Sequence, residues 1–350
     1  MTTPTTSAGV REARRIKQRL LDQAEACMRD TIEAQAAFWM SVDARAALPA
    51  KAIRDLVEAG GKRLRPAFCV SGYLAAGGDP DNRVIVDMAA AIEFLHVFAL
   101  VHDDILDDSS LRRGVPTVHV RQSAEHERRG LRGEPRRFGE GVAILVGDLA
   151  HVYADRLAAA APWDARQIWS VLRTEMIVGQ FLDVLTAAET SADPETARLI
   201  AVCKSGHYSV HRPLALGAAV AGRGDLAPVF EEYGVALGEA FQLRDDLIDL
   251  LGDAKATGKP VGLDLHGYKM TLLLALAMQR DERIRELAEK GREPHRLRDL
   301  LCECGSVAEV ERHIDRLVDR ACRAIGAAPI DEGWRDELTA MAYWVAYRNQ

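Results

Sequence analysis

Apolar residues recur every three or four positions over most of the chain, the pattern of helices that bury one face. Stretches with this pattern cover residues 13–40, 48–59, 84–108, 142–160, 164–187, 195–222, 226–251, 269–291 and 306–326. No stretch alternates apolar and polar residues in the two-residue period of a half-buried strand. The sequence therefore predicts an all-α protein, a single large bundle of long helices.

Glycine and proline separate the predicted helices, but no shift in composition marks a linker between domains. We therefore expect one helical domain over residues 13–350, preceded by a short disordered tail over residues 1–12. Residues 121–138 stand apart, because they contain many arginines and almost no apolar residues. We interpret this segment as a polar insertion loop on the surface, with a functional basic patch as the alternative.

Composition narrows the class of protein. The chain has 350 residues, of which 48% are hydrophobic and 28% charged, as in a soluble globular protein. A formal net charge of −7 argues against a general nucleic-acid binder, and no uncharged apolar run reaches the ~18 residues of a membrane span. The six cysteines lack the spacing of a zinc site, which favours reduced thiols and a cytoplasmic protein.

Two matching clusters of aspartates carry the strongest chemical signal. DDILD occupies residues 103–107 and DDLID occupies residues 245–249, each at the end of an apolar helical stretch. The first and last carboxylates of each cluster are four residues apart, so a helix places them on one face, where they repel each other. A solvated helix face explains one such cluster, but two in like contexts point to Mg²⁺, which binds carboxylates together with substrate phosphates.

Basic residues near these clusters fit a phosphorylated ligand. GGKRLRP at residues 60–66 combines a glycine break with three cations, and backbone N–H groups and cationic side chains suit a diphosphate. Arg112 and Arg113 follow the first cluster directly. His96 lies two helical turns before Asp103 on nearly the same face, with a core histidine as the alternative.

These motifs together resemble those of the trans-isoprenyl diphosphate synthases, the polyprenyl synthetase family. The resemblance rests on GGKRLRP, HDDILDDSSLRRG and FQLRDDLIDLLGDAKATGKPVGLDL, and it runs from about residue 50 to residue 280. It implies a helical bundle around a central cavity, a homodimer, and about three Mg²⁺ ions with substrate bound. The implied reaction joins isopentenyl diphosphate to an allylic diphosphate (dimethylallyl, geranyl or farnesyl).

The resemblance also implies roles for individual residues. The metal ligands would be Asp103, Asp107, Asp245 and, more weakly, Asp249. The allylic diphosphate would be contacted by Arg112, Lys204 and Lys259. The isopentenyl diphosphate site would contain Lys62, Arg65, His96 and Arg113. Gln242 would lie near the reacting carbons. Ser205 stands where the family usually has threonine. Lys269 follows a loop (258–264) that would close over the substrates.

Product length is expected to depend on the helix that leads into the first cluster. In the family, bulky side chains four and five residues before the first aspartate are associated with short products; these positions are Ala99 and Phe98. One aromatic residue at the five-before position resembles geranylgeranyl (C20) synthases. For the product, the alternatives are a farnesyl (C15) or a longer (C25 and above) diphosphate. For the protein, they are a terpene cyclase and a non-catalytic partner of another synthase. For Phe98, the alternative is ordinary core packing.

Overall fold

The computed structural model describes residues 8–189, 193–251, 269–290 and 293–348. Helices dominate these residues and confirm the predicted all-α class. In the described part of the chain, the strands are β1 (Leu111–Arg112) and β2 (Val115–Pro116), which pair antiparallel. The chain divides into two compact units, and the prediction of a single domain stays a prediction. Unit 1 consists of the described residues of Met1–Lys17, Ser71–Pro80 and Pro162–Gln350; unit 2 consists of Gln18–Val70 and Asp81–Ala161.

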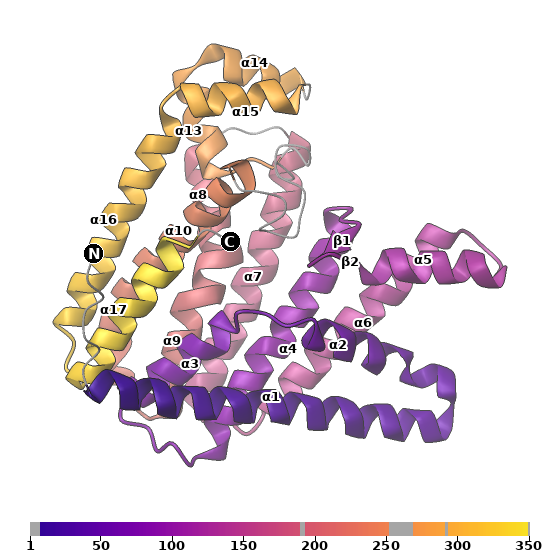
Figure 1. Ribbon diagram of the computed structural model, residues 1–350, viewed down its shortest axis with the longest axis horizontal. Helices are drawn as coiled ribbons and strands as arrows, with labels where there is room; N and C mark the ends of the chain where they lie inside the picture. The colour runs from indigo at the N-terminus through magenta and orange to yellow at the C-terminus, as the bar shows by residue number, and fades with distance from the viewer. Residues whose placement is uncertain (1–7, 190–192, 252–268, 291–292, 349–350) are drawn as a thin grey trace. The chain divides into compact units, whose positions relative to one another are not determined.

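Unit 2 is built around helix α4, which ends in the first aspartate cluster. Its elements, two of which continue into unit 1, are α1 (Ala8–Val42), η1 (Ala44–Ala47), α2 (Leu48–Glu58), α3 (Leu64–Ala75), α4 (Arg83–Leu106), β1, β2, α5 (Val118–Arg129) and α6 (Pro135–Ala158). Helix α6 packs along α4 on one side and α5 on the other (Figure 1). The Phe94 ring is fully buried in this packing, 5.5 Å from the ring of Tyr153.

Helix α4 is also long and apolar enough to cross a membrane, with a mean hydropathy of 2.1 over its most apolar window. Among the described residues it is the one helix with this property. However, 67% of that window is buried inside the protein. Burial of this kind is typical of the central helix of a soluble core.

Unit 1 is built around helix α10, which carries the second aspartate cluster. Its further elements are α7 (Trp163–Glu189), α8 (Pro194–Ile200), η2 (Ala201–His211), α9 (Arg212–Val220), η3 (Gly224–Leu226), α10 (Ala227–Leu251), α13 (Leu272–Arg280), α14 (Glu282–Lys290), α15 (Pro294–Glu303), α16 (Ser306–Gly326) and α17 (Glu332–Ala346). Helices α16 and α17 lie side by side and pack on α10 (Figure 1). The fully buried Tyr233 of α10 donates a hydrogen bond to the backbone oxygen of Leu338 on α17, 2.8 Å away.

Segment η2 is a π-helix of 11 residues that continues α8 and leads into α9. Glycines allow neighbouring backbones to approach it closely on two sides. A Cβ atom on Gly179 of α7 would lie 2.6 Å from the backbone nitrogen of Lys204, and one on Gly238 of α10 would lie 2.7 Å from Gly206. π-Helical turns often occur at functional sites, and this one carries Lys204 and Ser205.

The predicted insertion loop over residues 121–138 is wrong, because a helical hairpin forms there. Helix α5 ends at Gly130, whose φ of 59° lies in the left-handed region that glycine tolerates. Helix α6 then starts at Pro135, and the Glu134 side chain accepts hydrogen bonds from the next backbone N–H groups. Arginine, glutamate and alanine are good helix formers, and Gln122 and His126 supply a buried face despite the low apolar content.

The expected disordered tail is also partly wrong. Helix α1 begins at Ala8, and Val10 is buried, so burial extends the helix into residues 8–12. Residues 1–7 lie outside the described residues. The predicted helix over 269–291 is divided at Asp281, whose extended backbone ends α13. Its side chain then accepts a hydrogen bond from the backbone nitrogen of Arg283 in α14.

Candidate active site

The first aspartate cluster forms the last turn of α4 in unit 2. Asp103 and Asp107 are half-buried, as expected for two residues one turn apart on the same helix face. Asp104 points inward and is only 2% exposed. Its carboxylate accepts a hydrogen bond from Arg112 Nε at 2.7 Å, and Arg112 Nη2 also lies 3.5 Å from Asp103 Oδ2. The cluster therefore has two partly exposed carboxylates, here called the outward pair, and one buried carboxylate that orients an arginine.

A tight hairpin between β1 and β2 positions the two arginines that follow the cluster. Arg113 and Gly114 form its turn with φ angles of 52° and 78°, the conformation of a two-residue hairpin that matches the strand twist. The turn buries Arg112 and exposes Arg113. The guanidinium of Arg113 reaches the backbone of Gly61, where an added Cβ atom would lie 2.9 Å from Nη2. An added Cβ atom at Gly61 would thus meet only the end of a flexible, exposed side chain, which could move aside.

A cationic cluster forms in unit 2 around His96. The Nη1 atom of Arg65 lies 3.3 Å from Nε2 of His96. Burial, together with the charges of Arg65, Arg113 and Arg112, lowers the pKa of His96 well below its usual range. The neutral ring accepts the hydrogen bond from Arg65 at Nε2, which places its own proton on Nδ1. Lys62 is exposed on the adjoining loop.

Arg63, the second of the three cations in the GGKRLRP motif, stabilises the fold. Its Nε donates to Glu25 at 2.9 Å and its Nη1 donates to Glu93 at 2.6 Å. Glu93 is buried on α4, so this ion pair satisfies a carboxylate in the core. The sequence motif thus contains both a structural arginine and residues of the cationic cluster.

The second aspartate cluster, on α10 in unit 1, repeats the arrangement of the first. Asp245 and Asp249 are half-buried, whereas Asp246 is buried. Asp246 accepts a hydrogen bond from Gln242 Nε2 at 2.7 Å. In both clusters, the second aspartate turns inward to a partner within its own unit, and the first and last aspartates face outward. Asp245 also accepts a hydrogen bond from Arg348, a residue that sequence reasoning missed.

A cavity of about 70 Å³ in unit 1 brings together four residues predicted for the site: Lys204, Ser205, Gln242 and Lys269. Lys204 Nζ donates to the Asp183 carboxylate at 2.6 Å, and this carboxylate also lines the cavity. Sequence reasoning missed Asp183, because it lies on a separate helix; its only signal is a charged residue within an apolar stretch of α7. Lys259 and the loop over 258–264 lie outside the described residues.

An ion pair between α7 and the start of α9 supports the π-helix that carries Lys204. Arg212 Nε donates to the Glu175 carboxylate at 2.8 Å, and His207 Nδ1 lies 3.3 Å from it. Burial raises the pKa of Glu175, but the hydrogen bonds from His207 and Arg212 outweigh it and lower this pKa to about 2. Glu175 is therefore ionised at neutral pH and links the C-terminal half of η2 and the start of α9 to α7.

We expect the Glu175→Gln variant to lose about 2 kcal/mol of unfolding free energy at pH 7, because two half-buried donors lose their charged acceptor. The folded-state pKa of Glu175 lies below its ordinary value of 4.5, so this contribution is full above about pH 4.5 and disappears as the pH falls towards 2. Denaturant unfolding of both proteins between pH 3 and 7 measures the difference. A gap that stays constant down to pH 3 would contradict the assignment.

The donors of both clusters fit a hard divalent cation. Carboxylate oxygens are the ligands that Mg²⁺ prefers, and Mg²⁺ is often held by one or two carboxylates plus substrate phosphates. Among the described residues, no group of three or more His, Cys, Asp or Glu converges into a closed metal site. The outward pairs Asp103/Asp107 and Asp245/Asp249 therefore match an open site in which the substrate supplies further oxygens.

The residues expected to set product length lie on α4, one turn before the first cluster. Phe98 and Ala99 are both half-buried. The Phe98 ring packs 4.5 Å from the ring of His102 and 5.0 Å from that of His151 on α6. Sequence reasoning did not identify His151, because no spacing along the chain pairs it with Phe98.

Comparison with known proteins gives a consistent result. Residues 47–302 match the profile of the polyprenyl synthetase family. Geranylfarnesyl diphosphate synthase of Aeropyrum pernix is 31% identical over 299 residues, covering 81% of this chain and 88% of that protein. Octaprenyl diphosphate synthase of Escherichia coli is 28% identical, covering 84% and 88%.

Among solved structures, the geranylgeranyl pyrophosphate synthase of Corynebacterium glutamicum in complex with isoprenyl diphosphate and magnesium superimposes with a TM-score of 0.88. That protein is 32% identical, and the match covers 95% of this chain and 98% of its own. The family match spans most of the chain and includes both aspartate clusters. The chain thus belongs to the polyprenyl synthetase family and is an isoprenyl diphosphate synthase, a prenyltransferase.

Proposed function

We propose that the chain joins isopentenyl diphosphate head-to-tail to allylic diphosphates (dimethylallyl, geranyl and farnesyl) and releases all-trans geranylgeranyl diphosphate. The observation that carries this proposal is the repeated geometry of the two aspartate clusters. Each offers two outward carboxylates beside its own set of cations, an arrangement suited to a metal-bound diphosphate. The reaction takes place in the cytoplasm.

The allylic diphosphate would bind at the aspartate clusters. Asp103, Asp107 and Asp245 would hold about three Mg²⁺ ions, with Asp249 as a weaker ligand. Mg²⁺ supplies positive charge that stabilises the departing diphosphate. Arg112 and Lys204 would contact the same diphosphate, as would Lys259.

The isopentenyl diphosphate would bind at the cationic cluster of unit 2. Lys62, Arg65 and Arg113 would contact its phosphates, and neutral His96 would donate from Nδ1. When the C–O bond of the allylic substrate breaks, the double bond of isopentenyl diphosphate attacks the allylic cation. A new C–C bond forms, and a proton is then lost.

The cavity in unit 1 supports roles for the remaining residues. Gln242, held by its hydrogen bond to Asp246, would lie near the reacting carbons. Ser205 and Lys269 would bind the allylic diphosphate together with Lys204, since all three line the same cavity. Exclusion of water matters here, because a free allylic cation would otherwise be hydrolysed.

Exposed apolar side chains support a homodimer. On α7 they are Trp163, Val171, Ile177, Val178, Phe181, Val184 and Leu185. Soluble monomers rarely leave so many apolar residues of one helix in water. We propose that a second copy of the chain covers this helix.

We expect the Phe98→Ala variant to make longer products than the natural chain, because the ring that stops the growing tail is removed. The rings of His102 and His151 hold Phe98 in place, so the variant creates space at this point of α4. Chromatography of the dephosphorylated products measures the shift from C20 to C25 and above. A suitable control is Phe138→Ala, which removes an exposed ring from α6 and should leave product length unchanged. An unchanged C20 product from Phe98→Ala would assign Phe98 to core packing.

The product itself is tested by incubating the natural chain with isopentenyl diphosphate, Mg²⁺ and each allylic diphosphate in turn. We expect geranylgeranyl diphosphate as the main product from all three. A dominant C15 or C30 product would overturn the assigned length and leave the family unchanged. The related proteins include C20, C25 and C40 synthases, so this measurement decides between them.

A further inference from the structure

The segment after α17 places Arg348 on the second aspartate cluster. The Arg348 side chain is only 8% exposed, and its Nη2 donates to Asp245 Oδ1. Its Nη1 donates to the backbone oxygen of Val345 at 3.0 Å. The guanidinium carbon lies 4.1 Å from the ring centroid of Phe241, one turn before Asp245 on α10. The guanidinium is therefore held by a charge, a backbone acceptor and an aromatic face.

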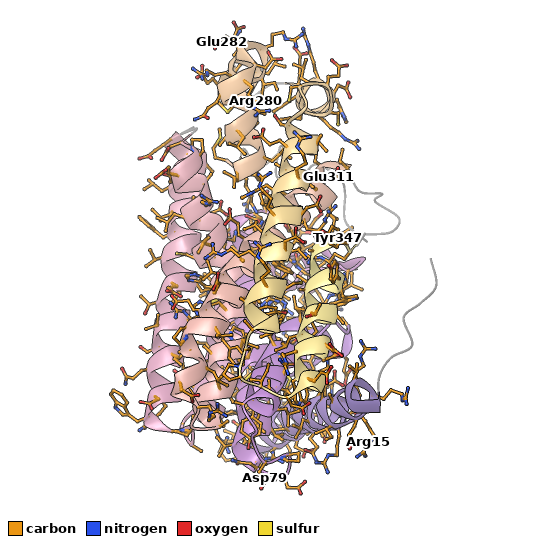
Figure 2. The ribbon with its side chains drawn as sticks, turned by 90° about the vertical axis from the view of Figure 1, so that its left-hand side faces the viewer. Arg15, Asp79, Arg280, Glu282, Glu311 and Tyr347 are labelled. Carbon is orange, nitrogen blue, oxygen red and sulfur yellow. The ribbon has the colours of Figure 1, made fainter. Side chains whose placement is uncertain are left out.

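Neighbouring contacts fix the path of this segment. Arg244 Nε donates to the backbone oxygen of Ala346 at 2.6 Å, and its guanidinium carbon lies 5.9 Å from the Tyr347 ring. The Tyr347 hydroxyl donates to Asp315 of α16 at 2.6 Å. Figure 2 shows Tyr347 at the end of α17, next to the neighbouring helix α16. The position of Arg348 on Asp245 thus results from several independent contacts.

Arg348 and a metal ion compete for the same carboxylate. Asp245 is one of the two outward carboxylates of the second cluster and is 45% exposed. A guanidinium on Oδ1 and a cation at that atom repel each other and cannot both be accommodated at contact distance. We propose that Arg348 occupies Asp245 while the second cluster is free of metal, and that Mg²⁺ binding displaces its guanidinium. This inference rests on the proposed function, in which Asp245 is a metal ligand.

Competition of this kind affects metal loading. When a metal must displace an intramolecular cation, its apparent affinity is the intrinsic affinity multiplied by the fraction of protein whose carboxylate is free. Because Asp245 is half-exposed, we expect the pair to lower metal affinity about fivefold. A diphosphate that arrives with Mg²⁺ supplies additional oxygen ligands, so loading is favoured when substrate is present.

Titration of the full chain with Mn²⁺, followed by electron paramagnetic resonance, tests the proposal without measuring turnover. Mn²⁺ prefers the same oxygen ligands as Mg²⁺, and inorganic pyrophosphate serves as the second probe. The Arg348→Gln variant should bind Mn²⁺ about fivefold more tightly than the natural chain. The Tyr347→Phe variant, which loses only the hydroxyl that contacts Asp315, should shift the affinity in the same direction. The Tyr347→Phe variant therefore still tests the proposal if the Arg348→Gln variant does not fold.

Two controls define the mechanism. In an Asp245→Asn background, Arg348→Gln should have no further effect, because the shared carboxylate is gone. Arg320→Gln breaks the exposed pair between α16 and Glu232 and should leave Mn²⁺ binding unchanged. Unchanged or weaker Mn²⁺ binding by both Arg348→Gln and Tyr347→Phe would overturn the proposal. If the natural chain bound no Mn²⁺ even with pyrophosphate, the proposed function itself would fail.

Discussion

The Asp103→Ala variant is expected to turn over about 1,000-fold more slowly than the natural chain, because a metal ligand to the leaving diphosphate is lost. Asp103 is the first of the two outward carboxylates on α4 and is half-buried. Its removal leaves the buried pair between Asp104 and Arg112 in place, so the fold should be retained. Turnover at saturating Mg²⁺ and both substrates measures the effect, with circular dichroism to check the fold.

Asp108→Ala is the matched control for this prediction. Asp108 follows the cluster directly, but its side chain is 71% exposed and lies 3.4 Å from Arg136. Exposed pairs of this kind contribute little to stability, and this residue has no proposed metal contact. Its variant should keep near-normal turnover. Equal losses in the two variants, or near-normal turnover of Asp103→Ala, would contradict the role given to Asp103.

The Asp104→Ala variant should show the largest loss of stability, about 3 kcal/mol of unfolding free energy. Asp104 is buried and pairs with Arg112, whose side chain is only 11% exposed. Removing the carboxylate leaves a buried guanidinium without its main partner, and water cannot replace it fully. Denaturant unfolding measures the change. A loss below about 1 kcal/mol, the range of exposed pairs, would show that Arg112 finds another acceptor or water.

Local helix geometry made the aspartate clusters predictable. Residues four apart on a helix share one face, so the pairing of Asp103 with Asp107 and of Asp245 with Asp249 follows from spacing alone. The inward direction of Asp104 and Asp246 did not follow, because it depends on which face of α4 and α10 packs against the core. That choice is made by tertiary contacts.

Helical periodicity predicted most of the fold but failed where apolar residues are few. The hairpin of α5 and α6 is stabilised by capping at Gly130 and Glu134 and by buried polar residues, which a search for apolar stripes does not detect. The π-helical form of η2 depends on backbone contacts with Gly179 and Gly238 from other helices. Such contacts are not encoded in local spacing.

Contacts between distant parts of the chain account for the site residues that were missed. Arg348 lies 103 residues after Asp245, and Lys204 lies 21 residues after its partner Asp183. His151 contacts Phe98 across α4 and α6. Spacing along the sequence predicts which residues of one helix are neighbours. Each of these pairs instead forms only after two separate segments of the chain have packed together.

The most direct test of the central claim is the stoichiometry of pyrophosphate release by the natural chain. With Mg²⁺, isopentenyl diphosphate and farnesyl diphosphate, we expect one pyrophosphate for each isopentenyl unit incorporated. With farnesyl diphosphate alone, we expect almost none. Rapid release without isopentenyl diphosphate would indicate a cyclase or a hydrolase. No release under either condition, and none when dimethylallyl diphosphate replaces farnesyl diphosphate, would indicate a non-catalytic partner. Both results would contradict a condensing synthase.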